Sequence, residues 1–521
     1  MARPGAHRSL SREESPVHPR KIIRDFIGIA GSQYLVRMLL VARGVIAARL
    51  LGPTGFGLWN GISLVMDYGT QSQFGTLQGL DQTVPPRIVE GDTRGLVRVK
   101  RAGLFNVLAF GLLFTSLCAI YFHRSPGLIR GFWGEGGLLL ACLTALLINV
   151  SNYHNSILRS HGDVGSVSAW TLLQGLIGAV LGVALIPRLG AWGLLYGWLT
   201  GTLLALVYVR FRGGRFVPLA PAASVDSRLL LTVGFPMFVY VVLNFVMRSL
   251  DRLVILRFLG IESLGFYQLA VMAINMLLYL PDSLAYVMYP RILARYHETG
   301  SDPGAVREPI ERAMRFVSLL LPLFCALAYL AADDAVLWIL PRYRAGVPSL
   351  RILCFGAAAL GLGSLSSVVL MTLRRQVVLI PVALTTTLVG GGLMIAAARF
   401  GYGIRGVAWV TLGAYAVHSA VMLWFTFGGL GERPWRRLFS VARLFVPLAI
   451  AILVAFGCNT FLPWGNQTGF IAVVRLALGV ALFLGVYLAA AVPLARGIGI
   501  AQLALEFRLP GFARLRAMFR P

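Results

Sequence analysis

Charged side chains are scarce in this chain. Asp, Glu, Lys and Arg together make up 13% of its 521 residues, whereas hydrophobic residues make up 57% and the mean hydropathy is +0.75. Soluble domains typically contain about 45–50% apolar and about 25% charged residues. A soluble core cannot contain this apolar excess, so the composition excludes an ordinary soluble protein and indicates a surface that largely faces lipid.

Motifs that carry enzyme chemistry are also missing. The five cysteines fall within apolar segments without a CxxC spacing, which favours small packed side chains over a disulfide framework or a metal site. No P-loop is present, and the longest loop expected between spans, 289–313, holds no nucleophile–base pair. We therefore expect no enzyme activity, no cofactor and no metal.

The apolar runs are long, rich in Leu, Ala, Val and Gly, and lack the alternation of strands, which predicts membrane-spanning helices. The expected fold is an all-α polytopic membrane protein with about fourteen spans. The expected limits are 26–48, 57–80, 102–122, 137–158, 165–187, 192–210, 229–256, 264–288, 314–332, 348–372, 376–398, 404–427, 442–462 and 471–494. The second span is interrupted by polar residues.

Arginine sets the expected orientation. Most Lys and Arg fall in the tails and in alternate loops, including the clusters 98–101, 210–215 and 433–437, which places both termini in the cytoplasm. The net charge of +26 is then explained by topology and anionic lipid, and no nucleic-acid partner is expected. Residues 1–21 are predicted to be a disordered tail with no cleavable signal peptide, and 495–521 a basic amphipathic segment on the inner leaflet.

The sequence contains two copies of one motif, the repeated phrase. ARLLGPTGFGLWN at 48–60 aligns with LRFLGIESLGFYQ at 256–268 at an offset of 208 residues, and the same offset pairs Arg43 with Asp251. After a four-residue gap, the PRIV loop at 86–89 aligns with PRIL at 290–293. A weaker pair, PRLGAWG at 187–193 and ARFGYGIRG at 398–406, closes each half.

Six spans separate the equivalent segments, so both halves insert in the same orientation. The sequence predicts two parallel six-helix bundles, 22–212 and 229–428, joined by a cytoplasmic linker at 213–228 and followed by two additional spans within 429–494. In transporters built from such repeats, the substrate site lies between the halves near the midplane.

The repeated phrase itself is predicted to be structural. Its glycines suit a tight turn because glycine adopts positive φ without steric cost. Arg49 and Arg257 can extend to the water interface, and Trp59 and Tyr267 are expected in the aromatic belts there.

Polar residues inside spans are expensive, so we expect function where they gather. In the seventh span Asn244, Arg248, Asp251 and Arg252 follow the spacing i, i+4, i+7, i+8, which predicts one helical face with a net positive charge. A cationic surface for an anionic substrate is favoured, and a staple between Arg248 and Asp251 is the alternative.

Further polar candidates lie in other spans. The first span supplies Gln33, Arg37 and Arg43, and Arg43 either pairs with Asp251 or lies near the outer interface. Asp67 and Asp282 are candidates for cation coupling or for ordinary polar contacts. We take Arg37, Arg248, Arg252 and Arg43 as candidate substrate-binding residues.

These phrases, with YPRI at 289–292 and GYGIRGVAW at 401–409, resemble the polysaccharide-flippase branch of the multidrug/oligosaccharidyl-lipid/polysaccharide exporter superfamily, in particular Wzx-type oligosaccharide flippases. The resemblance covers essentially the whole chain. It implies twelve core helices, here with two more, around a central cavity that opens alternately to each side. Sugar contacts vary too much among such proteins to be carried onto residues of this chain.

The resemblance also implies a cargo and a place. The cargo would be an undecaprenyl-pyrophosphate-linked glycan, moved across the bacterial cytoplasmic membrane for O-antigen, capsule or exopolysaccharide assembly. A glycan polymerase or export complex is an expected partner, and the flippase itself is expected to be a monomer. The alternatives are a lipid II flippase, a cation-coupled multidrug exporter and a membrane glycan ligase or polymerase.

Overall fold

The computed structural model describes residues 19–124, 128–213, 224–373, 375–461 and 470–495, and all regular structure within them is helical. The expected all-α class is confirmed. The α-helices are α1 (Pro19–Thr70), α2 (Thr76–Glu90), α3 (Thr93–Arg124), α4 (Leu128–Ser160), α5 (Val164–Leu189), α6 (Ala191–Gly213), α7 (Ser224–Phe258), α8 (Ile261–Glu298), α9 (Pro303–Ile339), α10 (Val347–Thr372), α11 (Leu379–Arg399), α12 (Gly403–Gly429), α13 (Pro434–Phe461) and α14 (Phe470–Ala495).

Twelve spans within the described residues, from α3 to α14, are long and apolar enough to cross a membrane. The chain is therefore a multi-pass membrane protein. Most of the expected N-terminal tail, linker and C-terminal tail, at 1–21, 213–228 and 495–521, lies outside the described residues.

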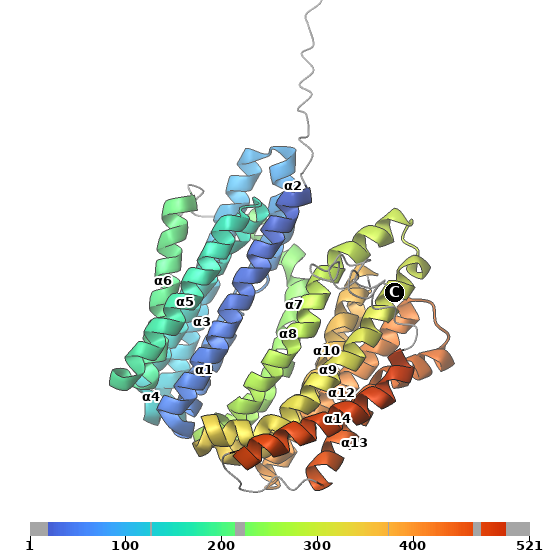
Figure 1. The fold of residues 1–521 in the computed structure, drawn as a ribbon. Helices are drawn as coiled ribbons and strands as arrows, with labels where there is room; N and C mark the ends of the chain where they lie inside the picture. Colours follow the sequence, from blue (N-terminus) through green and yellow to red (C-terminus); the bar gives the residue numbers. More distant parts are fainter. Residues whose placement is uncertain (1–18, 125–127, 214–223, 374, 462–469, 496–521) are drawn as a thin grey trace, which may run out of the picture.

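The helices form two groups that follow the order of the chain (Figure 1). Helices α1 to α6 lie on one side of the molecule, where α5 packs on α6 and on α1. Helices α8 to α14 lie on the other side, where α10 packs against α8, α9 and α12. The two groups contact each other through α1 with α8, and α7 packs on α2 of the first group and on α11 of the second.

Both copies of the repeated phrase bend the chain in the same way. Gly52 has φ 67° and ψ 178°, and its equivalent Gly260 has φ 89° and ψ 176°. These left-handed values favour glycine, and they separate one helical segment from the next. The expected turn at the first glycine of the phrase is therefore present in both halves.

The two copies also meet each other. A Cβ atom on Gly57 would overlap the carbonyl oxygen of Ile261, and one on Gly265 would overlap the carbonyl oxygen of Pro53. Because these four residues are two pairs at the 208-residue offset, the contact is related by an approximate two-fold axis between the halves. Only glycine at both positions permits this approach of the helix backbones.

The second expected span, 57–80, is wrong as a single helix. Its first part completes α1, the chain then leaves the helix at 71–75, where Phe74 and Gly75 have positive φ, and α2 follows. The equivalent α8 is continuous. The first half has four more residues than the second between its glycine phrase and its PR-I segment, and the break lies within this interval. The additional residues explain why one half has a broken helix.

Two polar segments expected to be loops are helical. PRIV at 86–89 lies in α2, PRIL at 290–293 lies in α8, and only 299–302 separate α8 from α9 in the expected loop 289–313. Polarity ends the apolar span, but it does not end the helix, because backbone hydrogen bonds continue in water as well as in lipid.

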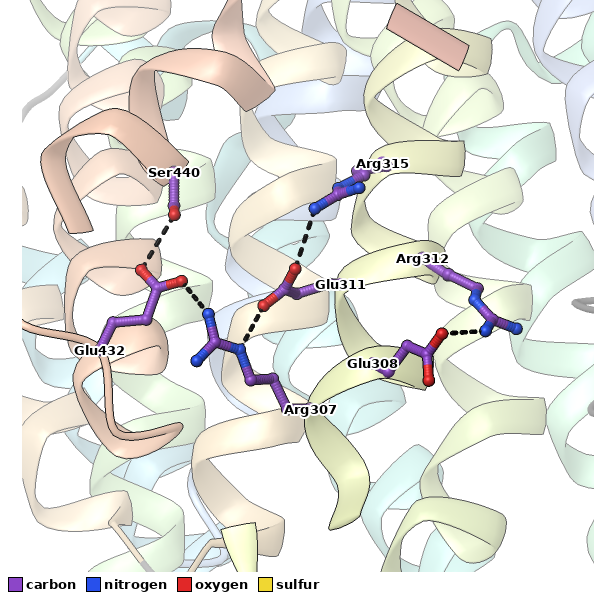
Figure 2. Close-up of polar contacts among 7 residues, drawn as sticks. All are labelled: Arg307, Glu308, Glu311, Arg312, Arg315, Glu432 and Ser440. Carbon is purple, nitrogen blue, oxygen red and sulfur yellow. Dashed lines mark hydrogen bonds and ion pairs between the residues drawn. The ribbon is translucent and has the colours of Figure 1, made fainter. Parts of the chain in front are cut away.

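Charged side chains attach the start of α13 to α9, as Figure 2 shows. Arg307 in α9 donates to Glu311 at 2.6 Å and also pairs with Glu432, which lies just before α13. Ser440 in α13 donates to the second oxygen of Glu432 at 2.9 Å. At α14, the Tyr487 hydroxyl donates to the Leu319 carbonyl of α9 at 2.7 Å. The two additional spans thus pack on the second half.

Candidate functional site: a polar pocket between α7, α8, α10 and α12

A pocket of about 220 Å³ lies among four helices of the second half. Its polar lining comes from α7, α8, α10 and α12, and its remaining lining is apolar. The lining residues are Tyr240, Asn244, Arg248, Asp282, Ala285, Leu360, Gly363, Ser364, Ser367, Val368 and His418. Charged and amide groups are costly in a membrane-spanning region, which makes this pocket the candidate functional site.

The sequence placed three of these residues among the candidates. Arg248 donates from Nη2 to the Ser364 hydroxyl at 3.2 Å, and Asn244 donates to the Tyr240 carbonyl at 3.4 Å. Asp282 on α8 is half-buried and lies within electrostatic reach of Arg248. Tyr240, Asn244 and Arg248 share one face of α7 because steps of four residues advance only about 40° around a helix.

A fourth candidate, Arg37, approaches the pocket from the first half. Its guanidinium carbon lies 4.6 Å from the centre of the Tyr279 ring, one turn before Asp282 on α8. This is a cation–π geometry. Arg37 also lies within electrostatic reach of Asp282. Two arginines, one from α1 and one from α7, therefore lie within electrostatic reach of one carboxylate, which leaves a net positive charge.

Arg252 belongs to a different contact, between α7 and α1. It lies within electrostatic reach of Asp67, and its Nε is buried without a hydrogen-bond partner in the described part of the chain. Beside it, the hydroxyls of Tyr68 in α1 and Ser249 in α7 are 2.8 Å apart. Asp67 and Arg252 thus lie at the boundary between the halves, outside the pocket lining.

Asp251 is directed into the second half and is 2% exposed. It accepts a hydrogen bond from the Tyr267 hydroxyl at 2.7 Å and one from the Arg252 backbone N–H at 2.8 Å. Neither the staple with Arg248 nor the pairing with Arg43 is among its contacts. The single face expected for α7 divides because residues 251 and 252 lie about 100° apart around the helix.

Arg43 lies within the first half, outside the pocket. Its guanidinium carbon is 5.0 Å from the Trp198 ring centre and 5.5 Å from that of Trp59, and its buried Nη1 has no hydrogen-bond partner among the described residues. For Gln33 the structure describes the helix backbone in α1 but not the side chain.

The aromatic residues of the repeated phrase are not in a belt. Trp59 is 6% exposed and packs against Arg43, and Tyr267 is fully buried against Asp251. The expectation of an interfacial belt was wrong because the glycine contact between the halves draws both segments inward.

Sequence reasoning missed Tyr279, Ser364, Ser367 and His418. His418 could have been found from the sequence, because a histidine is a polar residue inside the apolar span 404–427. The two serines carried no such signal, because serine is common in apolar helices and bonds to its own helix there.

Residues 46–343 match the model of a protein family whose description is "polysaccharide biosynthesis protein". The chain belongs to this family. The match covers more than half of the chain and contains both copies of the repeated phrase. No protein of curated function matches this chain.

Solved structures show the fold of this family member. The lipid II flippase MurJ, in an inward closed conformation, superposes with a TM-score of 0.70 at 14% identity, over 90% of this chain and 99% of that one. A multidrug resistance transporter of the MATE family and MOP superfamily, in an inward-facing conformation, gives 0.65 at 16% identity, over 76% and 94%. The transporter fold expected from the resemblance is confirmed.

Proposed function

We propose that this protein is a flippase that moves an undecaprenyl-pyrophosphate-linked oligosaccharide from the inner to the outer leaflet by alternating access. The pathway served would be the assembly of an O-antigen, capsule or exopolysaccharide. The observation that carries the proposal is the net positive pair Arg37 and Arg248, which come from the two halves and both lie within electrostatic reach of Asp282.

The chemistry of the cargo fits this arrangement. A diphosphate and its hydrated glycan do not cross hydrocarbon unaided, because their polar groups would lose water without replacement. The planar guanidinium group of arginine suits phosphate oxygens. The prenyl chain can remain in lipid while the head group passes between the halves.

The membrane potential assists this direction. Moving an anion outward across an inside-negative membrane is favoured by about 2.3 kcal/mol per charge per 100 mV. We propose the bacterial cytoplasmic membrane as the location, with both termini in the cytoplasm. A glycan polymerase or export complex is the proposed partner of a monomeric flippase.

A lipid II flippase is the second candidate, because its cargo also carries a diphosphate and its fold is shared. A multidrug exporter of the same superfamily would recognise cations, which favours an acidic site. The surplus of arginine beside Asp282 disfavours that reading, and the transporter fold gives no support to a glycan ligase or polymerase.

The test uses full-length protein in proteoliposomes and measures movement of undecaprenyl-pyrophosphate-linked oligosaccharide to the opposite leaflet. Replacing Arg248 or Arg37 by Gln is expected to lower the rate at least about tenfold, because each removes a phosphate-binding group. Arg257→Gln is the matched control, since Arg257 lies on α7 at its exposed end. It is expected to keep the rate.

The abundance of folded protein is measured alongside the rate. Equal loss of folded protein and of transport in R248Q and R37Q would support a purely structural role. Transport of lipid II at the same rate as the glycan-linked lipid would favour the second candidate, and export of a cationic drug without lipid movement would overturn the proposal.

A further inference from the structure

The pocket lining contains groups of both charge signs and several neutral polar groups. Arg248 carries a positive charge and Asp282 a negative one, and Ser364, Ser367 and the Asn244 amide line the same pocket. Arg248 would repel a metal cation, and Asp282 would repel a phosphate placed next to it, so a diphosphate held by Arg37 and Arg248 has to lie on the side of these guanidinium groups away from Asp282. A neutral polyhydroxylated group can bind to both Asp282 and Arg248, because a hydroxyl can donate to a carboxylate and accept from a guanidinium.

Hydrogen-bonding capacity remains unused in this lining. Within the described residues, Nδ1 of the 2% exposed His418 is buried without a partner, and the half-buried carboxylate of Asp282 lines the same pocket. Buried polar groups in proteins are almost always paired, so the unpaired Nδ1 of a pocket-lining histidine indicates a polar ligand. The described residues include no cluster of His, Cys, Asp or Glu able to hold a metal ion.

The size of the pocket limits its occupant. Sites for drug-sized ligands have volumes of roughly 300–1,000 Å³, and this pocket has about 220 Å³. It can hold one sugar ring, and an oligosaccharide would extend beyond it. The apolar part of the lining, from Leu360 and Val368, suits the C–H face of such a ring.

The position of the pocket relates it to the phosphate groups. Arg37 lies on Tyr279, one turn from Asp282, so the proposed diphosphate site adjoins the pocket. The sugar nearest the diphosphate is the only sugar of such a cargo that is bonded directly to it. Its ring is therefore the part that can reach the pocket while the diphosphate contacts Arg37 and Arg248.

We propose that the pocket between α7, α8, α10 and α12 binds the first sugar of the lipid-linked glycan, the one bonded to the diphosphate. This proposal rests on the proposed function and assigns to Asp282 and His418 the recognition of sugar hydroxyl groups. The remaining sugars would lie outside this pocket.

The test measures binding of two lipids to full-length protein in nanodiscs. One probe is undecaprenyl pyrophosphate without sugar, and the other is the same lipid carrying a single N-acetylhexosamine. The protein is expected to bind the sugar-bearing lipid at least about tenfold more tightly. Asp282→Asn is expected to reduce this ratio to below about threefold, without weakening binding of the bare lipid.

A matched pair of serine variants provides the control. Ser367 lines the pocket, whereas the adjacent Ser366 is fully buried and donates to the Leu362 carbonyl at 3.1 Å. Ser367→Val is expected to lower the ratio severalfold and Ser366→Val to leave it unchanged. Arg37→Gln is expected to weaken both lipids equally.

Two results would overturn the assignment of the pocket while sparing the proposed function. One is equal binding of both lipids. The other is an unchanged ratio in D282N together with lost dependence of transport on sodium or protons, which would identify a coupling site. Failure of both lipids to bind would instead overturn the proposed function itself.

Discussion

The two halves place different chemistry at the same positions. Arg43 in the first half and Asp251 in the second are equivalents at the 208-residue offset, as are Trp59 and Tyr267. In the first half Arg43 contacts Trp59, and in the second half Asp251 contacts Tyr267. The first half has a guanidinium 5.5 Å from an indole ring, and the second has a carboxyl group bonded to a phenol hydroxyl at 2.7 Å.

A third pair of equivalent positions, 198 and 411, takes part in these contacts. Trp198 and Thr411 each lie five residues after the last glycine of the closing phrases. Trp198 covers the other side of Arg43 at 5.0 Å, and the Thr411 hydroxyl lies 3.4 Å from that of Tyr267. Duplication thus retained three places in the backbone, and their side chains stabilise a buried polar group with aromatic faces in one half and with hydroxyls in the other.

This difference leads to different costs of substitution. Asp251 has specific hydrogen bonds, whose loss leaves a buried acceptor unpaired. Arg43 has diffuse contacts with two rings and already has an unpaired buried Nη1 among the described residues. The second half is therefore expected to be the more sensitive to small changes at these positions.

The largest effect is expected where the halves touch. Gly57→Leu inserts a side chain against the Ile261 carbonyl, and overpacking of this kind costs about 3 kcal/mol or more when backbone must move. We expect little folded protein by size-exclusion chromatography. Gly61→Ala, one turn later with Leu256 at an ordinary 3.7 Å, is the control and should fold normally. Equal behaviour of the two would refute the close contact.

The second largest effect is expected at Tyr267, and it is compared with the effect at its equivalent, Trp59. Tyr267→Phe removes a hydroxyl from buried Asp251 and is expected to destabilise the protein by about 1–3 kcal/mol. Trp59→Phe keeps an aromatic face near Arg43 and is expected to cost less. Thermal unfolding in detergent measures both, and a larger loss of stability in W59F would reverse the comparison.

The smallest effect is expected at Arg43. Arg43→Met loses cation–π contacts of about 0.5–2 kcal/mol but removes the desolvation of an incompletely paired guanidinium. The two terms oppose each other, so we expect a stability change within about 1 kcal/mol in the same unfolding assay. A loss beyond 3 kcal/mol would show that the two rings stabilise Arg43 far more than these distances indicate.

The candidate site was predictable to the extent that it depends on one helix. Asn244 and Arg248 could be placed together from their spacing, and Asp282 and Arg37 from their cost in a membrane. The sequence could not show that Asp251 faces Tyr267 whereas Arg252 faces α1, because the rotation of α7 is set by its neighbours. His418 and the two serines join the pocket from α12 and α10, and Tyr279 on α8 holds Arg37 beside it. Spacing within a span says nothing about such contacts.

Composition and hydropathy by themselves determined that the chain is helical and crosses a membrane many times, because hydrocarbon demands that backbone groups be paired within each span. The repeated phrase determined the duplication and the position of the two glycine bends. Only the tertiary structure decided which polar residues meet, where the first half breaks its helix, and which groups surround the pocket. Those choices depend on packing between segments far apart in the sequence, and no local pattern encodes them.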